Sequence, residues 1–275
     1  MYQCFNVELD NPDAEKLLSN ISEPTLMTLK ARSGLLQKSI RELYIPETNT
    51  IDAAGLKKLW FPSGDSANHV FISHSHKDID MARKLAAWLK EKFNITSFID
   101  YDVWGYAQDL IREINDLYSS IPNNMYDYDK ANYVCSHIHM MLSSALTDMI
   151  YKCEALFFLN TQNSLKDHDR TTSPWIMHEL LTTKVIERYQ CIKRKSIARE
   201  HFRDQFIEKR AMDLMPDFSH HAEVKHLLDI NIDTLLQWQK SSDLNYNGYY
   251  NLTSLYNLLN GDTTLYHEDK AELYV

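Results

Sequence analysis

The chain has 275 residues, of which 44% are hydrophobic and 24% are charged, and its formal net charge is −9. This length can bury a sizeable core, enough for one α/β domain with additions or for two small domains. The negative charge argues against nucleic acid as a partner, because affinity for the phosphate backbone comes mainly from clustered Lys and Arg.

The cysteines and the first residues of the chain favour an intracellular location. Cys4, Cys135, Cys153 and Cys191 are far apart and form no CxxC pair, so we expect reduced thiols rather than a zinc or redox cluster. The chain does not begin with a basic segment followed by an apolar one, and no segment has the length that a bilayer crossing requires. We therefore expect a cytoplasmic protein with no membrane partner.

Residues 1–68 are expected to form a helical N-terminal extension. The apolar residues of its middle part have close to the spacing of one buried helix face; they are Leu26, Leu29, Leu36, Ile40 and Leu43. Pro62 and Gly64 then interrupt the periodicity, as a connection before a new domain requires. The extension is a candidate surface for a protein partner.

An α/β domain is predicted over residues 69–240. A short apolar run at residues 69–73 is followed by an amphipathic helix at residues 77–93 and by a second apolar run at residues 95–100. A third apolar run, EALFFLN at residues 154–160, supplies another buried strand. Parallel strands joined through helices need right-handed crossovers, so this pattern predicts a doubly wound sheet whose ligand lies beyond the carboxyl ends of the strands.

The later part of the domain has weaker signals. Ser173 and Pro174 predict a helix start, with Ser as N-cap and Pro at the first helical position. A last strand is expected at residues 224–230, a short helix at residues 230–240, and a helical tail rich in Asn and Tyr at residues 241–275.

Three short stretches, taken together and in order, resemble the Toll/interleukin-1 receptor (TIR) domain family. They are VFISHSHKD at residues 70–78, the strand end FID at residues 98–100 with the loop that follows it, and SPWIMHEL at residues 173–180. The last is similar to the family's pattern of Ser, any residue, Trp, three residues, Glu and Leu. The resemblance implies a flavodoxin-like parallel sheet flanked by helices.

The sequence departs from ordinary TIR domains in two ways, since it contains an insertion and the family's last strand is hard to locate in it. Residues 118–151 form an insertion between the first helix after the loop and the third strand, where family members are shorter. The family's second helix therefore corresponds either to residues 108–117 or to residues 137–152.

Glu179 stands where NAD-cleaving TIR domains, particularly bacterial and plant ones, have a catalytic glutamate. Such domains break the nicotinamide–ribose bond and release nicotinamide with ADP-ribose or a cyclised form of it, whereas other members only assemble complexes. A carboxylate near the ribose stabilises the oxocarbenium-like charge, and one carboxylate can suffice because nicotinamide leaves as a neutral molecule. The alternative interpretation of Glu179 is an acid in the first turn of a helix, favoured by the helix dipole.

The loop after the first strand contains candidate NAD-binding residues. In an open α/β fold this loop offers backbone N–H groups and a helix N-terminus to a pyrophosphate. The candidates are Ser73, His74, Ser75 and Lys77. The alternative is that Ser75 or Asp78 caps the following helix and that the histidines are solvated.

Three further residues are candidates for contact with NAD. Asp100 and Trp104, with Gly105, belong to the loop that in TIR domains lies over the ligand and contributes to self-association. Trp175 shares a helix face with Glu179, and it either stacks on the nicotinamide or ribose or belongs to the core. For Asp100 and Trp104 the alternatives are a strand-end cap and a loop anchor.

No metal or bound cofactor is expected. His74 and His76, like His137 and His139, have a metal-like spacing, but no acidic or Cys partner lies at a characteristic distance. Neither GxGxxG nor GxxxxGK followed by Ser or Thr occurs, so hydride transfer through a Rossmann motif and P-loop phosphoryl transfer have no support.

The resemblance therefore predicts a NAD+ glycohydrolase or ADP-ribosyl cyclase with NAD as its substrate. It further implies self-association through TIR surfaces and a role in prokaryotic antiviral defence signalling. Two alternatives stay open. One is a non-catalytic adaptor that assembles protein partners; the other is a nucleoside glycosidase or deoxyribosyltransferase, whose fold and carboxylate chemistry are related.

Overall fold

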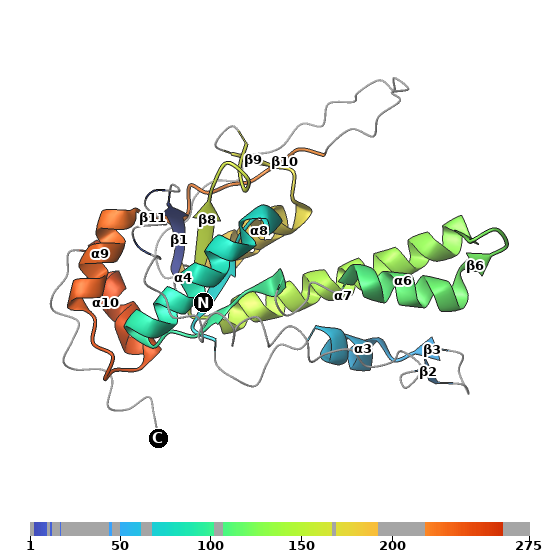
Figure 1. Ribbon diagram of the computed structural model, residues 1–275, viewed down its shortest axis with the longest axis horizontal. Helices are drawn as coiled ribbons and strands as arrows, with labels where there is room; N and C mark the ends of the chain where they lie inside the picture. The colour runs from blue at the N-terminus through green and yellow to red at the C-terminus, as the bar shows by residue number, and fades with distance from the viewer. Residues whose placement is uncertain are drawn as a thin grey trace.

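The computed structural model describes residues 3–9, 12, 17, 44–45, 50–61, 68–101, 107–166, 169–191 and 218–260. Its core is a five-stranded sheet in the order β11–β1–β8–β4–β5, in which every pair of neighbours is parallel (Figure 1). The strands are β1 (Gln3–Glu8), β4 (Val70–Ser73), β5 (Ser97–Phe98), β8 (Ala155–Asn160) and β11 (Leu228–Ile230). The central strands are almost continuously buried, as expected when helices cover both faces of a parallel sheet.

The strand order is compatible with a flavodoxin-like fold but differs from its simple form. Numbered along the chain, the five strands lie in the order 3-2-4-1-5. The part β5–β4–β8 reproduces the 2-1-3 portion of the flavodoxin-like order 2-1-3-4-5. The fourth place is taken by β1, the strand nearest the start of the chain, which pairs with β8 over six residues.

The helical extension predicted over residues 1–68 is wrong at its beginning, because Gln3–Glu8 form a strand inside the sheet. Phe5 and Val7 are fully buried there. Further along, β2 (Tyr44–Ile45) pairs with β3 (Thr50–Ile51), and α3 (Ala53–Trp60) follows. The five apolar residues on which the helical prediction rested, between residues 26 and 43, lie outside the described residues.

One face of the sheet is covered by α4 (Ile79–Phe93), α9 (Ile232–Ser241) and α10 (Gly248–Asn260). Stacked rings join α4 to α9 within this helical layer, with the ring centroids of Phe93 and Trp238 3.8 Å apart. Leu252 and Leu255 of α10 are fully buried in this layer. Within the segment expected as a tail, residues 248–260 therefore belong to the core.

The other face is covered by α7 (Tyr128–Lys152) and α8 (Pro174–Cys191). With α6 (Ala107–Tyr118), α7 forms a helical hairpin that extends beyond the sheet, and α3 lies beside it (Figure 1). The short strands β6 (Ser120–Ile121) and β7 (Met125–Tyr126) close the hairpin. Both candidates for the second helix, residues 108–117 and 137–152, are thus helical, and the predicted insertion is the larger part of this hairpin.

A small antiparallel pair, β9 (Arg170–Thr171) and β10 (His220–His221), lies next to α8. The helices predicted at residues 77–93 and 230–240 correspond to α4 and α9, and the strand predicted at residues 154–160 corresponds to β8. Of the strand predicted at residues 224–230, only residues 228–230 form β11. None of the helices in the described ranges combines the length and apolar character that a bilayer crossing requires.

Candidate functional site

The candidate site lies at the carboxyl ends of β4 and β5, beside α8. The chain leaves β4 toward α4 on one face of the sheet and leaves β8 toward α8 on the opposite face. Such a divergence between neighbouring strands is a topological switch point, where open α/β sheets bind ligands. Ser73, the last residue of β4, lies at this point and pairs in register with Phe158 of β8.

Glu179 is buried and hydrogen-bonded at this switch point. The helix α8 begins at Pro174, and the Ser173 hydroxyl accepts from the backbone N–H of Ile176, as the predicted N-cap requires. Glu179 is in the second turn, only 2% exposed, and accepts a hydrogen bond from the Ser73 hydroxyl at 2.5 Å. The interpretation of Glu179 as a first-turn acid is therefore wrong.

Two further predicted residues, His74 and Asp100, lie beside this pair. The Nδ1 atom of His74 is 3.7 Å from an Asp100 carboxylate oxygen and 3.3 Å from the carbonyl oxygen of Ile72. His74 is buried, so the alternative in which its ring is solvated is wrong, whereas the side chain of Asp100 is 27% exposed. Asp100 is thus the part of this cluster that reaches the surface.

The surroundings of Glu179 make its charged form unfavourable. Burial separates the carboxyl group from water, and the negative charge of Asp100 adds repulsion, so the pKa of Glu179 is raised well above its ordinary value. The hydrogen bond from Ser73 opposes this shift, because it stabilises the carboxylate. A buried carboxyl group with a raised pKa at a ligand-binding edge is typical of functional sites.

The remaining loop residues have mainly structural contacts. The Ser75 hydroxyl accepts from the backbone N–H of Lys77 at 3.4 Å and caps the short helix η3 (His76–Asp78), which agrees with the capping alternative. Lys77 is exposed. Asp78 does not cap α4; its buried carboxylate instead accepts from the Thr161 hydroxyl at 2.6 Å and from the Asn163 amide at 2.7 Å.

Sequence reasoning missed Thr161 and Asn163, which tie the loop after β8 to the start of α4. A sequence signal for them was present, because the polar run TQNS follows directly after the apolar strand and so lies at the carboxyl edge of the sheet.

The two tryptophans predicted to contact NAD differ in what the structure describes. Trp175 is partly buried against the core and contacts the His139 ring of α7 at 5.7 Å between centroids, while Trp104 lies outside the described residues.

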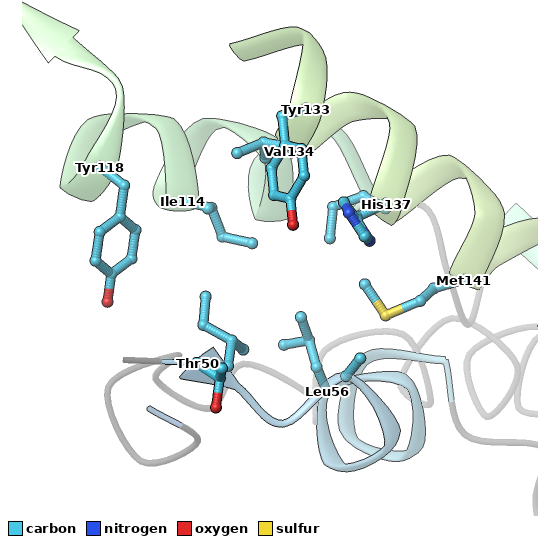
Figure 2. Close-up of a pocket in the computed structure, with 11 residues that line it drawn as sticks. Thr50, Leu56, Ile114, Tyr118, Tyr133, Val134, His137 and Met141 are labelled. Atoms are coloured by element: carbon cyan, nitrogen blue, oxygen red, sulfur yellow. The ribbon is translucent and has the colours of Figure 1, made fainter. Parts of the chain in front are cut away.

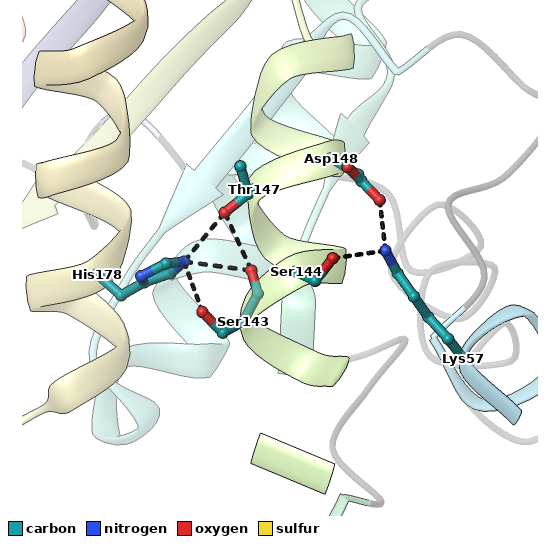
Figure 3. Close-up of polar contacts among 6 residues, drawn as sticks. All are labelled: Lys57, Ser143, Ser144, Thr147, Asp148 and His178. Atoms are coloured by element: carbon teal, nitrogen blue, oxygen red, sulfur yellow. Dashed lines mark hydrogen bonds and ion pairs between the residues drawn. The ribbon is translucent and has the colours of Figure 1, made fainter. Parts of the chain in front are cut away.

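Polar contacts fix α8 against α7 directly beside Glu179. The Nε2 atom of His178 lies 3.1 Å from the Ser143 hydroxyl, 3.2 Å from the Ser143 carbonyl oxygen and 3.2 Å from the Thr147 hydroxyl (Figure 3). On another side of α7, the ammonium group of Lys57 donates to Ser144 at 2.8 Å and to Asp148 at 2.5 Å. The helix that carries Glu179 is therefore joined through α7 to α3.

The described part of the chain contains no cluster of three or more His, Cys, Asp or Glu side chains that could hold a metal ion. Cys4, Cys135 and Cys153 are free thiols. Burial raises the pKa of the Cys153 thiol to about 12, so this thiol is protonated and unreactive at neutral pH.

Comparison with protein-family models, with curated proteins and with solved structures found no match to this chain. The class that the structure defines is an α/β protein with a five-stranded parallel sheet, compatible with a flavodoxin-like fold. The candidate site in this fold is the buried Ser73–Glu179 pair at the switch point.

Proposed function

We propose that the protein is a TIR-type enzyme that cleaves the nicotinamide–ribose bond of NAD, with Glu179 as its catalytic residue. The observation that carries the proposal is the buried hydrogen bond between Ser73 and Glu179 at the carboxyl edge of the sheet. Burying a carboxyl group is unfavourable unless it has partners, and a carboxyl group kept at a switch point is well placed to act on a ligand. The sequence resemblance adds the choice of NAD as the substrate.

The proposed reaction uses Glu179 as a single carboxylate. The bond between the ribose C1′ and the nicotinamide nitrogen breaks, and nicotinamide leaves with the electron pair as a neutral molecule. The carboxylate stabilises the positive charge that develops on the ribose. Water then adds to C1′ and loses a proton, so that NAD+ and water give nicotinamide, ADP-ribose and H+; attack by a group of the same molecule gives a cyclic product instead.

Neighbouring groups support this role of Glu179. The Ser73 hydroxyl orients the carboxyl group and favours its charged form. Asp100, which is partly exposed beside His74, is proposed to accept hydrogen bonds from ribose hydroxyls. Ser75, Lys77, Trp104 and Trp175 remain proposed NAD contacts.

The enclosed position of Glu179 implies that NAD binding requires movement, since the residue is only 2% exposed. We connect this movement with self-association, in which one copy packs against the next and completes the site. Activity is then expected to rise more steeply than in proportion to protein concentration.

Nicotinamide release from NAD by the concentrated full chain tests the proposal. Glu179→Gln keeps the shape of the side chain and removes its charge, so we expect at least a hundredfold loss of activity, in line with about 3 kcal/mol or more of transition-state stabilisation. The matched control is Glu113→Gln on α6, in the hairpin that extends from the sheet, which should retain wild-type activity. Unchanged turnover by Glu179→Gln would remove Glu179 from the mechanism.

The same enclosed position favours one alternative, a TIR-like adaptor in which Glu179 only stabilises the fold. That function predicts assembly with protein partners and no nicotinamide release under conditions that promote oligomers. A second alternative is a nucleoside glycosidase or deoxyribosyltransferase. The carboxylate of Asp100 near Glu179 favours it, because glycoside hydrolases ordinarily use two carboxylates. Turnover of free nucleosides in preference to NAD would support that activity.

A further inference from the structure

A cavity with a volume of about 400 Å³ lies between α3 and the α6–α7 hairpin (Figure 2). The residues that line it come from β3, α3, α6 and α7: Thr50, Ile51, Ala53, Leu56, Ile114, Tyr118, Tyr133, Val134, His137, Ile138 and Met141. None of these residues belongs to the Glu179 site. The volume is within the range of small-molecule sites in proteins.

The inner wall of the cavity is apolar. Leu56 and Ile138 are 2% and 1% exposed, and the side chains of Ile114, Val134 and Met141 continue the same surface. No Asp, Glu, Lys or Arg is among the described residues that line it. A charged ligand would lose its hydration here without gaining an opposite charge, so the wall selects against charged molecules.

Aromatic and polar groups stand at the mouth of the cavity. Figure 2 shows the Tyr133 hydroxyl and the His137 ring directed toward the open space, with Tyr118 at one side. The rings of Tyr133 and His137 are in contact, with their centroids 4.4 Å apart. These side chains offer ring faces for stacking and a small number of hydrogen-bonding atoms, which is the usual way in which an apolar pocket orients its ligand.

We propose that this cavity is a binding site for an uncharged aromatic small molecule of about two rings with one polar group. Its ring system packs against the apolar wall formed by α3 and α7, and its polar group faces His137 and Tyr133. Binding brings the ring system of the ligand into van der Waals contact with this apolar wall. The site is independent of the proposed reaction at Glu179.

Indole is the probe that tests this site, because it has two rings, no charge and one N–H donor. We expect calorimetric titration of the full chain with indole to show saturable binding at one site. A carboxylated indole should bind at least tenfold more weakly, because no Lys or Arg among the described residues lines the cavity to offset the cost of removing the carboxylate from water. Equal affinity for both compounds would overturn the proposed selectivity, and no saturable binding of indole up to its solubility limit would overturn the site.

Two matched pairs of variants locate the binding. Met141→Trp fills the cavity from α7 and should weaken indole binding at least tenfold, whereas Met140→Trp, at a neighbouring residue that is 70% exposed, should bind like wild type. Ala53→Phe fills the cavity from α3, and Ala54→Phe, on the same helix but outside the lining, is its control. Circular dichroism establishes that each variant is folded. If both filling variants fold and bind indole with wild-type affinity, the probe binds elsewhere and the assignment is wrong.

Discussion

Glu179 carries its carboxyl group in a place where ionisation destabilises the folded protein. The side chain is 2% exposed, the nearby charge of Asp100 is repulsive, and the hydrogen bond from Ser73 offsets these effects only in part, since the pKa of Glu179 is raised. Active-site residues are often unfavourable for the stability of the fold, which agrees with the proposed role of Glu179. It follows that the carboxyl group of Glu179 should lower the free energy of unfolding at neutral pH.

The pH dependence of stability tests this property without any assay of activity. Because the pKa of Glu179 is raised in the folded state, its favourable contribution is fully present below the unfolded-state value of about 4.5 and is lost as the pH rises through the folded-state pKa. Glu179→Gln avoids that loss, so its melting temperature should exceed that of wild type at pH 8, and the difference should shrink toward pH 4. Glu113→Gln, which removes a carboxyl group from α6, is the matched control. If Glu179→Gln is less stable than wild type at pH 8, the burial of the carboxylate is not unfavourable and this account of Glu179 is wrong.

At this scale, the sequence was informative about which residues meet but not about how they are buried. The resemblance to TIR domains implied that Ser73, His74, Asp100 and Glu179 belong to one ligand site, and the structure places Ser73 and Glu179 in hydrogen-bonding contact. The burial of His74 and the partnership of Asp78 with Thr161 depend on contacts between segments far apart in the chain. Local patterns such as a possible helix cap contain no information on such contacts.

At the scale of helices, the orientation of α8 depends on its contacts with α7. His178 is adjacent to Glu179 in sequence and bonds to Ser143 and Thr147, so it fixes the rotation of the helix that carries the carboxyl group. The start of α8 was predictable from Ser173 and Pro174, because capping is local. The contact with α7 was not, because periodicity does not specify which helices become neighbours.

Replacing His178 should therefore destabilise the protein. His178→Ala leaves the Ser143 and Thr147 hydroxyls without this partner, and we expect a loss of about 1–2 kcal/mol in the free energy of unfolding. The comparison is Glu223→Gln, which weakens the partly exposed ion pair between Glu223 and Lys184 of the same helix. That change should cost less than about 1 kcal/mol, because exposed ion pairs contribute little. Chemical denaturation measures both, and equal losses would contradict the anchoring role of His178.

At the scale of the whole molecule, the first residues of the chain complete the sheet. The strand β1 lies between β8 and β11, with Phe5 and Val7 fully buried. A domain that begins at residue 69, the boundary predicted from the sequence, therefore lacks an internal strand. The strand was missed because Asn6 interrupts its apolar run and its partners lie far along the chain, whereas β4 and β8 were recognised from their apolar runs.

Shortening the chain tests the place of β1. A chain that begins at residue 69 should fail to unfold cooperatively on heating, because β8 loses a partner over six residue pairs and β11 loses its neighbour. In the full chain, Val7→Asp buries a charge in the core and should lower stability by several kcal/mol, while Glu8→Gln, at the exposed next residue, should have little effect. Cooperative, wild-type-like melting of the shortened chain would show that β1 is dispensable.

The central claim is that Glu179 is the catalytic residue of an NAD-cleaving enzyme. Its most direct test is to measure nicotinamide release from NAD between pH 5 and pH 9, with the concentrated full chain and with Glu179→Gln under the same conditions. If Glu179 acts as a carboxylate, activity should rise with pH through an inflection well above the ordinary pKa of glutamate, since the pKa of Glu179 is raised. Glu179→Gln should lack both the activity and the inflection. Release of nicotinamide by Glu179→Gln at the wild-type rate, or an absence of release by the wild-type chain at every pH, would contradict the assignment of Glu179 as the catalytic residue of an NAD-cleaving enzyme.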